Sequence, residues 1–149
     1  MSRPKLVPEL LCSDLEVSLD FYVNIIGFRV LYDRPENRFA YLEMGGVEMM
    51  LDETPEISSD EGDWWTARAT KPYGRGVNFM IEVADVHAIH DRLKRLRWPL
   101  FRPMEDQWYR AGESKVGNRE FLVQDPDGYL LRFFTSLGDR DVVDSLSES

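Results

Sequence analysis

The chain has 149 residues, 43% hydrophobic side chains and a formal net charge of −9. A surface this acidic repels nucleic-acid phosphates, and no basic stripe offsets it, so we expect no nucleic-acid partner. No apolar run approaches the roughly 18 residues of a membrane span, and the N-terminal residues lack a signal-peptide apolar region, so we expect a cytoplasmic protein without a membrane partner.

The first half of the chain predicts one helix among four strands. Residues 6–12 are apolar and predict a strand, which Pro8 places at the edge of a sheet. Ser13 and Glu16 match a capping box, so we expect Ser13 to cap a helix that ends at Gly27. Further strands are predicted over residues 28–32, 39–44 and 47–51, which completes the order βαβββ.

The middle of the chain departs from this pattern. Residues 53–75 are rich in Glu, Asp, Ser, Pro and Gly, but they also contain the pair Trp64 and Trp65. Disordered linkers rarely contain paired tryptophans, so we interpret this segment as a structured connecting arm.

The second half predicts a strand over 76–83, a helix from Asp85 to a stop at Pro99, and a short strand over 100–102. Residues 103–117 are polar and are interpreted as a loop that carries Trp108 and Tyr109. A hairpin over residues 119–134 follows. Residues 138–149 are predicted to form a mobile acidic tail.

The closing hairpin turns at the sequence Asp-Pro-Asp-Gly over residues 125–128, where Pro126 presets φ and Gly128 tolerates a positive φ. Its second strand is apolar except for Arg132. We expect this charge to form an internal salt bridge with Glu48 or Glu9 instead of contacting a ligand.

The second half of the chain repeats the element order of the first. Aligning Asp14 with Asp85 brings the strands and helices into register, and aligning Gly46 with Gly128 superposes the two final hairpins. This spacing of 71 to 82 residues is too long for a solenoid repeat and fits a duplicated module. We therefore predict an α+β fold in which two βαβββ modules form a curved mixed-sheet cup. The predicted domain covers residues 1–137, with module one over 5–52, the arm over 53–75 and module two over 76–137.

These features resemble the vicinal oxygen chelate superfamily of glyoxalases, extradiol dioxygenases, fosfomycin-resistance enzymes and bleomycin-resistance proteins. The resemblance rests on the duplication, on the run from Ser13 through Phe21-Tyr22 to Gly27-Phe28, and on the closing turn at 125–128. It implies a cup of the glyoxalase/bleomycin-resistance type over roughly nine-tenths of the chain. Since this fold hosts several chemistries, the resemblance does not by itself identify a substrate.

Enzymes of this superfamily typically hold a divalent metal with His and Glu side chains from the first and last strands of the modules. The equivalent positions in this chain are Val7, Met50, Asn78 and Arg132. Divalent metals bind carboxylates, imidazoles or thiolates, and a guanidinium would repel them. The only histidines, His87 and His90, belong to the second helix, and His90 is interpreted as a packed or half-buried residue because it aligns with Leu19. We therefore expect no metal, no cofactor and no catalytic residue.

The closest resemblance is then to bleomycin-resistance proteins, through residues 117–121 and the turn at 125–128. Those proteins are non-enzymatic acidic homodimers that sequester a cationic, flat glycopeptide antibiotic in clefts at the dimer interface. The resemblance implies antibiotic resistance through antibiotic binding, in a cytoplasmic homodimer. Expected contacts are aromatic rings for stacking and carboxylates for the cationic part of the ligand. These residues are Trp64, Trp65, Trp108, Tyr109, Phe39, Tyr41, Glu48, Glu82 and Glu9.

Two other functions remain open. One is a metal-dependent glyoxalase-like or dioxygenase-like enzyme of the same fold. The other is a binding protein for a different small molecule. For each tryptophan, ordinary packing of a loop onto the sheet is as good an interpretation as ligand contact, because aromatic side chains dominate both cores and interfaces.

Overall fold

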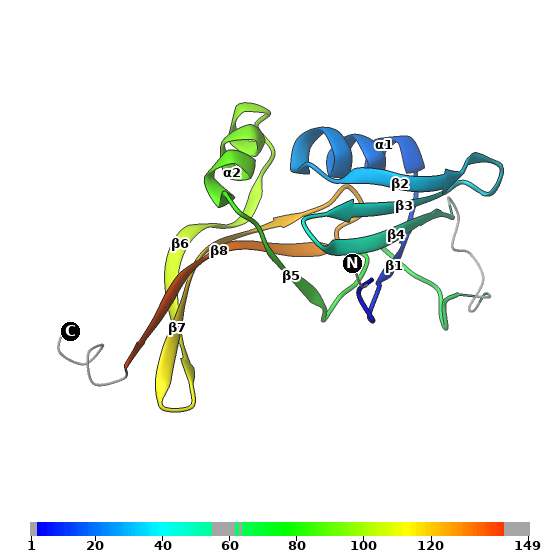
Figure 1. Ribbon diagram of the computed structural model, residues 1–149. Helices are drawn as coiled ribbons and strands as arrows, with labels where there is room; N and C mark the ends of the chain where they lie inside the picture. The colour runs from blue at the N-terminus through cyan, green and yellow to red at the C-terminus, as the bar shows by residue number, and fades with distance from the viewer. Residues whose placement is uncertain (1–2, 55–61, 63, 142–149) are drawn as a thin grey trace. The chain divides into compact units, whose positions relative to one another are not determined.

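The computed structural model describes residues 3–54, 62 and 64–141 (Figure 1). The chain divides into two compact units, each with a four-stranded sheet. Unit 1 contains Met1–Val77 and Asp125–Tyr129, and unit 2 contains Asn78–Gln124 and Leu130–Ser149. The strand orders are β1-β4-β3-β2 and β5-β8-β7-β6, so both units use the same order of their own four strands. The predicted α+β fold with a repeated strand–helix–strand pattern is confirmed.

Unit 1 places its first strand at an edge of the sheet, parallel to β4, as Pro8 predicted. The remaining pairs, β2 with β3 and β3 with β4, are antiparallel. The elements are β1 (Glu9–Cys12), α1 (Leu15–Leu19), the π-helical η1 (Asp20–Ile26), β2 (Arg29–Arg34), the 3-10 turn η2 (Pro35–Asn37), β3 (Phe39–Met44) and β4 (Val47–Glu53).

The helix of unit 1 begins one residue later than predicted. Asp14 is its N-cap and accepts a hydrogen bond from the backbone N–H of Val17 at 3.3 Å. Ser13 instead donates to Asp127, through its backbone N–H at 3.1 Å and its hydroxyl at 2.5 Å. The capping-box prediction is therefore wrong, because a buried carboxylate distant in sequence competes for Ser13. The predicted end at Gly27 is confirmed by its left-handed φ of 117°.

Buried side chains lie on both faces of the unit 1 sheet, and one face carries most of them. Because side chains alternate along a strand, paired residues of β1, β3 and β4 share that face. Its buried members are Leu10, Cys12, Ala40, Leu42, Met49 and Leu51. The helical segment supplies Leu15, Phe21, Tyr22, Ile25 and Ile26 as further buried side chains. Each large apolar side chain buried in this way contributes about 1.5–3 kcal/mol to folding.

The turn Asp125–Tyr129 belongs to unit 1 and is tied to it by buried polar contacts. The Tyr22 hydroxyl donates to Asp125 at 2.7 Å, and the Tyr129 hydroxyl donates to the Leu11 carbonyl at 2.9 Å. Asp127 is almost fully buried and lies 3.3 Å from Lys71 Nζ. Each buried polar group of the turn thus has a partner, as low-dielectric surroundings require.

Unit 2 contains a longer sheet than the sequence predicted. Its elements are β5 (Asn78–Glu82), α2 (Val86–Arg95), β6 (Leu100–Ala111), β7 (Ser114–Gln124) and β8 (Leu130–Asp141). Residues 103–117 are not a loop, because β6 and β7 pair as a long antiparallel hairpin, drawn in yellow-green to yellow in Figure 1. Strand β8 runs to Asp141, so residues 138–141 of the predicted tail are strand. The rest of that tail, 142–149, lies outside the described residues.

Two further features bear on the predictions. None of the helices in the described part of the chain is both long and apolar enough to span a membrane.

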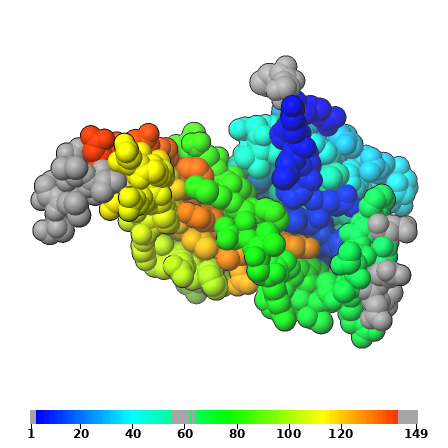
Figure 2. All heavy atoms as spheres, turned by 90° about the horizontal axis from the view of Figure 1, so that it is seen from below, coloured from blue at the N-terminus to red at the C-terminus, as the bar shows by residue number. Residues whose placement is uncertain are grey.

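Figure 2 shows the N-terminal segment of unit 1, in dark blue, at the surface of the molecule, in agreement with the exposure of Glu9 in β1.

Candidate functional site

Unit 2 carries a cavity of about 430 Å³. This volume is within the range of small-molecule sites, about 300–1,000 Å³. The cavity lies against one face of the sheet and is lined by residues of β5, β6, β7 and β8. The lining residues are Asn78, Phe101, Arg102, Pro103, Glu105, Gln107, Tyr109, Glu120, Leu122, Leu130 and Arg132.

Strand register arranges the charged residues of this face in two rows. Met80, Arg132, Leu122 and Arg102 are cross-strand neighbours in one row. Glu82, Phe134, Glu120 and Glu105 form the adjacent row. Each row is one side-chain period from the other, so a row with two arginines lies beside a row with three glutamates.

Arg132 and Glu120 form the central ion pair of the cavity. Arg132 Nε and Nη2 donate to the two Glu120 carboxylate oxygens at 3.0 and 3.2 Å, and Glu120 is only 5% exposed. The Tyr109 hydroxyl also donates to Glu120, at 3.0 Å, and the Arg132 guanidinium lies 5.1 Å from the centre of the Tyr109 ring. The hydrogen bonds with Glu120 raise the pKa of Arg132. Two effects raise the pKa of Tyr109: partial burial, which is the larger, and the hydrogen bond to Glu120.

This pair partly corrects the sequence prediction. Arg132 does form an internal salt bridge, but the predicted partners Glu48 and Glu9 are wrong, because Glu120 occupies the neighbouring position on β7. Sequence reasoning did not select Glu120. The period of two along residues 119–124 contained the signal, since it places Glu120 and Leu122 on one face of the hairpin with Arg132.

Of the ligand contacts predicted in this unit, only Tyr109 lines the cavity. Trp108, the residue before it, points to the other face of β6, where its ring meets Gly117 and the Arg140 guanidinium at 3.8 Å. The two side chains therefore lie on opposite faces of the β6–β7 hairpin. Glu82 shares the sheet face of Arg132 but does not line the cavity.

Four predicted contacts share the other face of the unit 1 sheet, and all but Glu9 are buried there. They are Phe39, Tyr41, Glu48 and Glu9. Tyr32 of the neighbouring strand stacks on Tyr41, with ring centres 4.9 Å apart. We call this surface the acidic aromatic face of unit 1.

The carboxylates of the acidic aromatic face are partly neutralised, by Arg3 at Glu48 and by Arg34 near Glu9. Glu48 is 9% exposed, its Oε1 has no hydrogen-bond partner among the described residues, and the nearest cation is Arg3 Nε at 3.9 Å. Burial and the neighbouring Asp52 carboxyl raise the pKa of Glu9. Such carboxylates gain from an added positive charge.

The paired tryptophans of the arm differ in their surroundings. Trp64 is 71% exposed, whereas Trp65 packs against the buried Leu11 and Tyr73. Trp65 therefore follows the packing interpretation, and Trp64 presents a bare ring on the surface of unit 1.

The superfamily positions for a metal do not fit one here. Within unit 2 they hold Asn78 and Arg132, and the nearest carboxylate, Glu120, is already bound by Arg132. Asn78 offers a neutral oxygen, and a guanidinium repels a divalent cation. The residues of this cavity therefore do not suit the metal that the fold implies.

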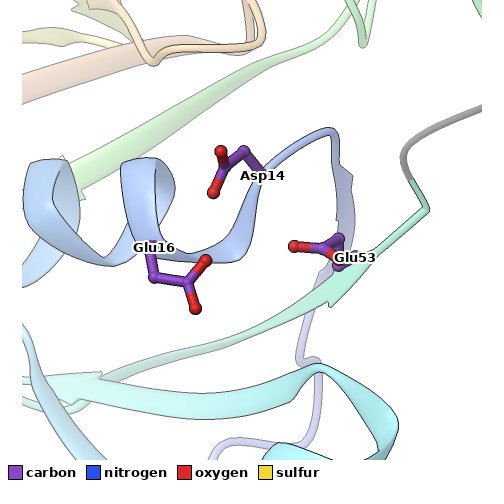
Figure 3. Close-up of side chains that lie close together, drawn as sticks. All are labelled: Asp14, Glu16 and Glu53. Atoms are coloured by element: carbon purple, nitrogen blue, oxygen red, sulfur yellow. The ribbon is translucent and has the colours of Figure 1, made fainter.

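Elsewhere in the described residues, one group of carboxylates comes close enough to hold a cation, namely Asp14, Glu16 and Glu53 (Figure 3). Arg38 already binds this group, with Nη2 at 2.6 Å from Glu16 and 2.7 Å from Glu53. The hydrogen bonds from Arg38 hold the pKa of Glu16 at about 2. This cluster is an ion-pair network that joins the helix start to β4.

Similar proteins agree with this architecture. A family model described as the Glyoxalase/Bleomycin resistance protein/Dioxygenase superfamily matches residues 7–133. The chain is 31% identical over 133 residues to a lactoylglutathione lyase of Neisseria meningitidis serogroup A, covering 87% of this chain and 88% of that protein. It is 29% identical over 143 residues to a bleomycin resistance protein of Geobacillus stearothermophilus, covering 88% of this chain and 96% of that protein. Among solved structures, TioX from Micromonospora sp. ML1 is 25% identical with a TM-score of 0.66, over 90% of this chain and 100% of that one. The chain therefore belongs to the glyoxalase/bleomycin resistance protein/dioxygenase superfamily, the vicinal oxygen chelate group, which contains both enzymes and bleomycin resistance proteins.

Proposed function

We propose that this protein is a bleomycin-resistance-like protein that binds and sequesters a cationic aromatic antibiotic without altering it chemically. The observation that carries the proposal is the Arg132–Glu120 ion pair, which stands where related enzymes carry a metal ligand. A guanidinium at this position repels a divalent cation. It also forms an ion pair with Glu120, the carboxylate that could otherwise attract such a cation.

The acidic aromatic face of unit 1 supports the same proposal. Tyr32 supplies an exposed ring that stacks on the buried Tyr41, and Glu48 supplies a carboxylate whose Oε1 lacks a hydrogen-bond partner among the residues described. A flat ligand with a positive group would satisfy both features, through ring contact and through charge. The net charge of −9 favours approach of such a ligand from solution.

A homodimer in the cytoplasm, with binding clefts at the interface between two copies, is part of the proposal. The relatives called bleomycin resistance proteins motivate it. Light scattering during size-exclusion chromatography measures the mass directly. A mass of twice 17.4 kDa supports the dimer, and a mass of 17.4 kDa at micromolar concentration contradicts it.

The binding proposal is tested by titrating bleomycin while following tryptophan emission. We expect saturable quenching at micromolar ligand, with one site for each chain. Trp64→Phe should remove a large part of the quenching, because that ring is exposed on unit 1. Trp98→Phe is the matched control, since Trp98 is held by a hydrogen bond to the Gln124 carbonyl at 3.0 Å. If the tryptophan emission spectrum of the wild-type protein does not change at micromolar bleomycin, the proposal is contradicted.

A second candidate is a metal-dependent enzyme, which the 31% identity to a lactoylglutathione lyase favours. Its test is metal analysis of the purified protein, followed by assay of that activity after reconstitution with zinc, nickel or manganese. Stoichiometric metal together with activity would establish the enzyme. A binding protein for another small molecule would instead reveal itself by a ligand that raises the melting temperature, because binding to the native state stabilises it by mass action.

A further inference from the structure

We propose that the cavity of unit 2 binds the carboxylate of a ligand whose body is an apolar ring, through the guanidinium groups of Arg132 and Arg102. The inference rests on the proposed function only in treating this cavity as a ligand site instead of a metal centre. It does not depend on bleomycin being the ligand.

Arg132 is held in one orientation by two residues of its own unit, Glu120 and Tyr109. Two bonds to Glu120 fix its Nε and Nη2, and the Tyr109 ring lies beside its guanidinium plane at 5.1 Å. A guanidinium has five N–H donors; two bond to Glu120 and the Tyr109 side chain takes a further bond, so two remain that can donate into the cavity that Arg132 lines. A guanidinium fixed in this way loses little conformational entropy when it binds a planar group of two oxygens.

Arg102 adds a second guanidinium on the same row of the sheet. Leu122 separates it from Arg132, so the two backbone positions are about 10 Å apart, two strand spacings. Arg102 is exposed, and it takes no part in the Arg132–Glu120 pair. The two arginines therefore flank an apolar residue at the wall of the cavity.

The buried acceptor of the cavity, Glu120, is already in use, whereas the arginines retain donors. The Glu120 carboxylate accepts three bonds, two from Arg132 and one from the Tyr109 hydroxyl. Glu105 accepts from the Gln107 side-chain amide at 2.7 Å. Glu120 is thus supplied with donors and Glu105 is exposed to solvent, whereas the arginines retain donors for an incoming acceptor. Carboxylates are the planar acceptors that match a guanidinium best.

The remaining wall of the cavity is suited to an apolar ring. Leu122 and Leu130 are half-buried, and Phe101 is an exposed aromatic side chain. All three line the cavity beside the arginine row. A ligand ring placed here would cover apolar surface that water now contacts, which favours binding.

The experiment compares benzoate with benzamidinium, two ions that share one ring and differ in the charge of a planar group. Each is titrated into ¹⁵N-labelled full-length protein, and backbone and arginine Nε–H signals are followed by NMR. We expect benzoate to bind about tenfold more tightly than benzamidinium, the ratio typical of one charge-assisted bond. Benzoate should also shift the Arg132 Nε–H signal.

Three variants complete the test. Arg132→Lys keeps the charge beside Glu120 but loses the planar fork, so benzoate affinity should fall about tenfold. Arg95→Lys makes the same change on the exposed part of α2, away from the cavity, and should leave benzoate affinity unchanged. Arg102→Gln, at an exposed side chain, gives a second reading that does not disturb the buried pair, and it should also weaken benzoate binding.

The inference is overturned if benzamidinium binds as tightly as benzoate, or if benzoate affinity is unchanged in Arg102→Gln or in folded Arg132→Lys. Its failure can be told from that of the proposed function. If benzoate binds selectively and bleomycin does not bind, the antibiotic-binding proposal fails and the carboxylate-site proposal stands. If bleomycin binds and benzoate is not preferred over benzamidinium, the carboxylate-site proposal fails and the antibiotic-binding proposal stands.

Discussion

Replacing Asp125 with Asn should remove a pH dependence from the stability of the protein. Asp125 is 5% exposed, and burial raises its pKa from the ordinary 3.8 to about 6. This increase persists although the Tyr22 hydroxyl and the backbone N–H groups of Asp127 and Tyr129 donate to the carboxylate. Two pKa units correspond to about 3 kcal/mol of difference between the protonated and ionised forms.

The sign of the effect follows from the direction of this pKa change. A carboxyl whose folded pKa is raised favours folding below its unfolded pKa near 4, and this contribution is lost as the pH rises through 6. Asn cannot ionise, so Asp125→Asn lacks this loss. Between pH 4 and pH 7.5, the wild-type free energy of unfolding should therefore fall relative to that of the variant by on the order of 2–3 kcal/mol.

Urea unfolding followed by circular dichroism at several pH values measures this difference. Every other titrating group is common to both proteins, so the difference between them isolates Asp125. A wild-type-minus-variant difference that stays constant from pH 4 to 7.5, or that rises with pH, would show that the buried turn does not perturb Asp125 as described.

Two further substitutions test the turn and the ion pair. Gly128→Ala should cost about 2–4 kcal/mol in free energy of unfolding, because its φ is 101° and a Cβ would lie 2.5 Å from Pro72 Cβ. Gly45→Ala, with a φ of 56° and open space, should cost only about 1–2 kcal/mol, and equal losses would contradict the close contact. Arg132→Met should cost about 3 kcal/mol, because it leaves the buried Glu120 carboxylate unpaired. Adding Glu120→Gln should recover part of that loss in urea unfolding, and an additive loss would argue against the pair.

The sequence predicted the elements whose residues carry their own local signals. Alternating apolar residues, the left-handed Gly27 and the Asp-Pro-Asp-Gly turn each act over a few residues, and all three correspond to structure. The start of the first helix was misassigned because Ser13 bonds to Asp127, which is 114 residues away. A capping pattern covers only four neighbouring residues, so it cannot show that the Asp127 carboxylate competes for Ser13.

The β6–β7 hairpin shows a different limit. Its residues 103–117 are polar on both faces, so the apolar alternation that identifies a half-buried strand is absent. Missing that strand also obscured the separation of Trp108 from Tyr109, because neighbouring residues point to opposite faces only once a strand is recognised.

The candidate site was predictable in part. The departure of Arg132 from the metal-binding pattern was evident in the sequence, but its partner depends on strand register, which sets Glu120 beside it on β7. Arg102 and Gln107 contribute to the cavity through the same unrecognised hairpin. These contacts arise from pairing between strands and have no motif of their own.

The central claim is that this member of the superfamily binds its ligand without a metal, because an arginine–glutamate pair occupies the metal position. Calorimetric titration of bleomycin into protein dialysed against EDTA tests the claim most directly. The account predicts saturable, micromolar or tighter binding of one ligand for each chain, unchanged when zinc or nickel is added back. Absence of binding heat at micromolar concentrations, or binding that appears only after metal is restored, would contradict it.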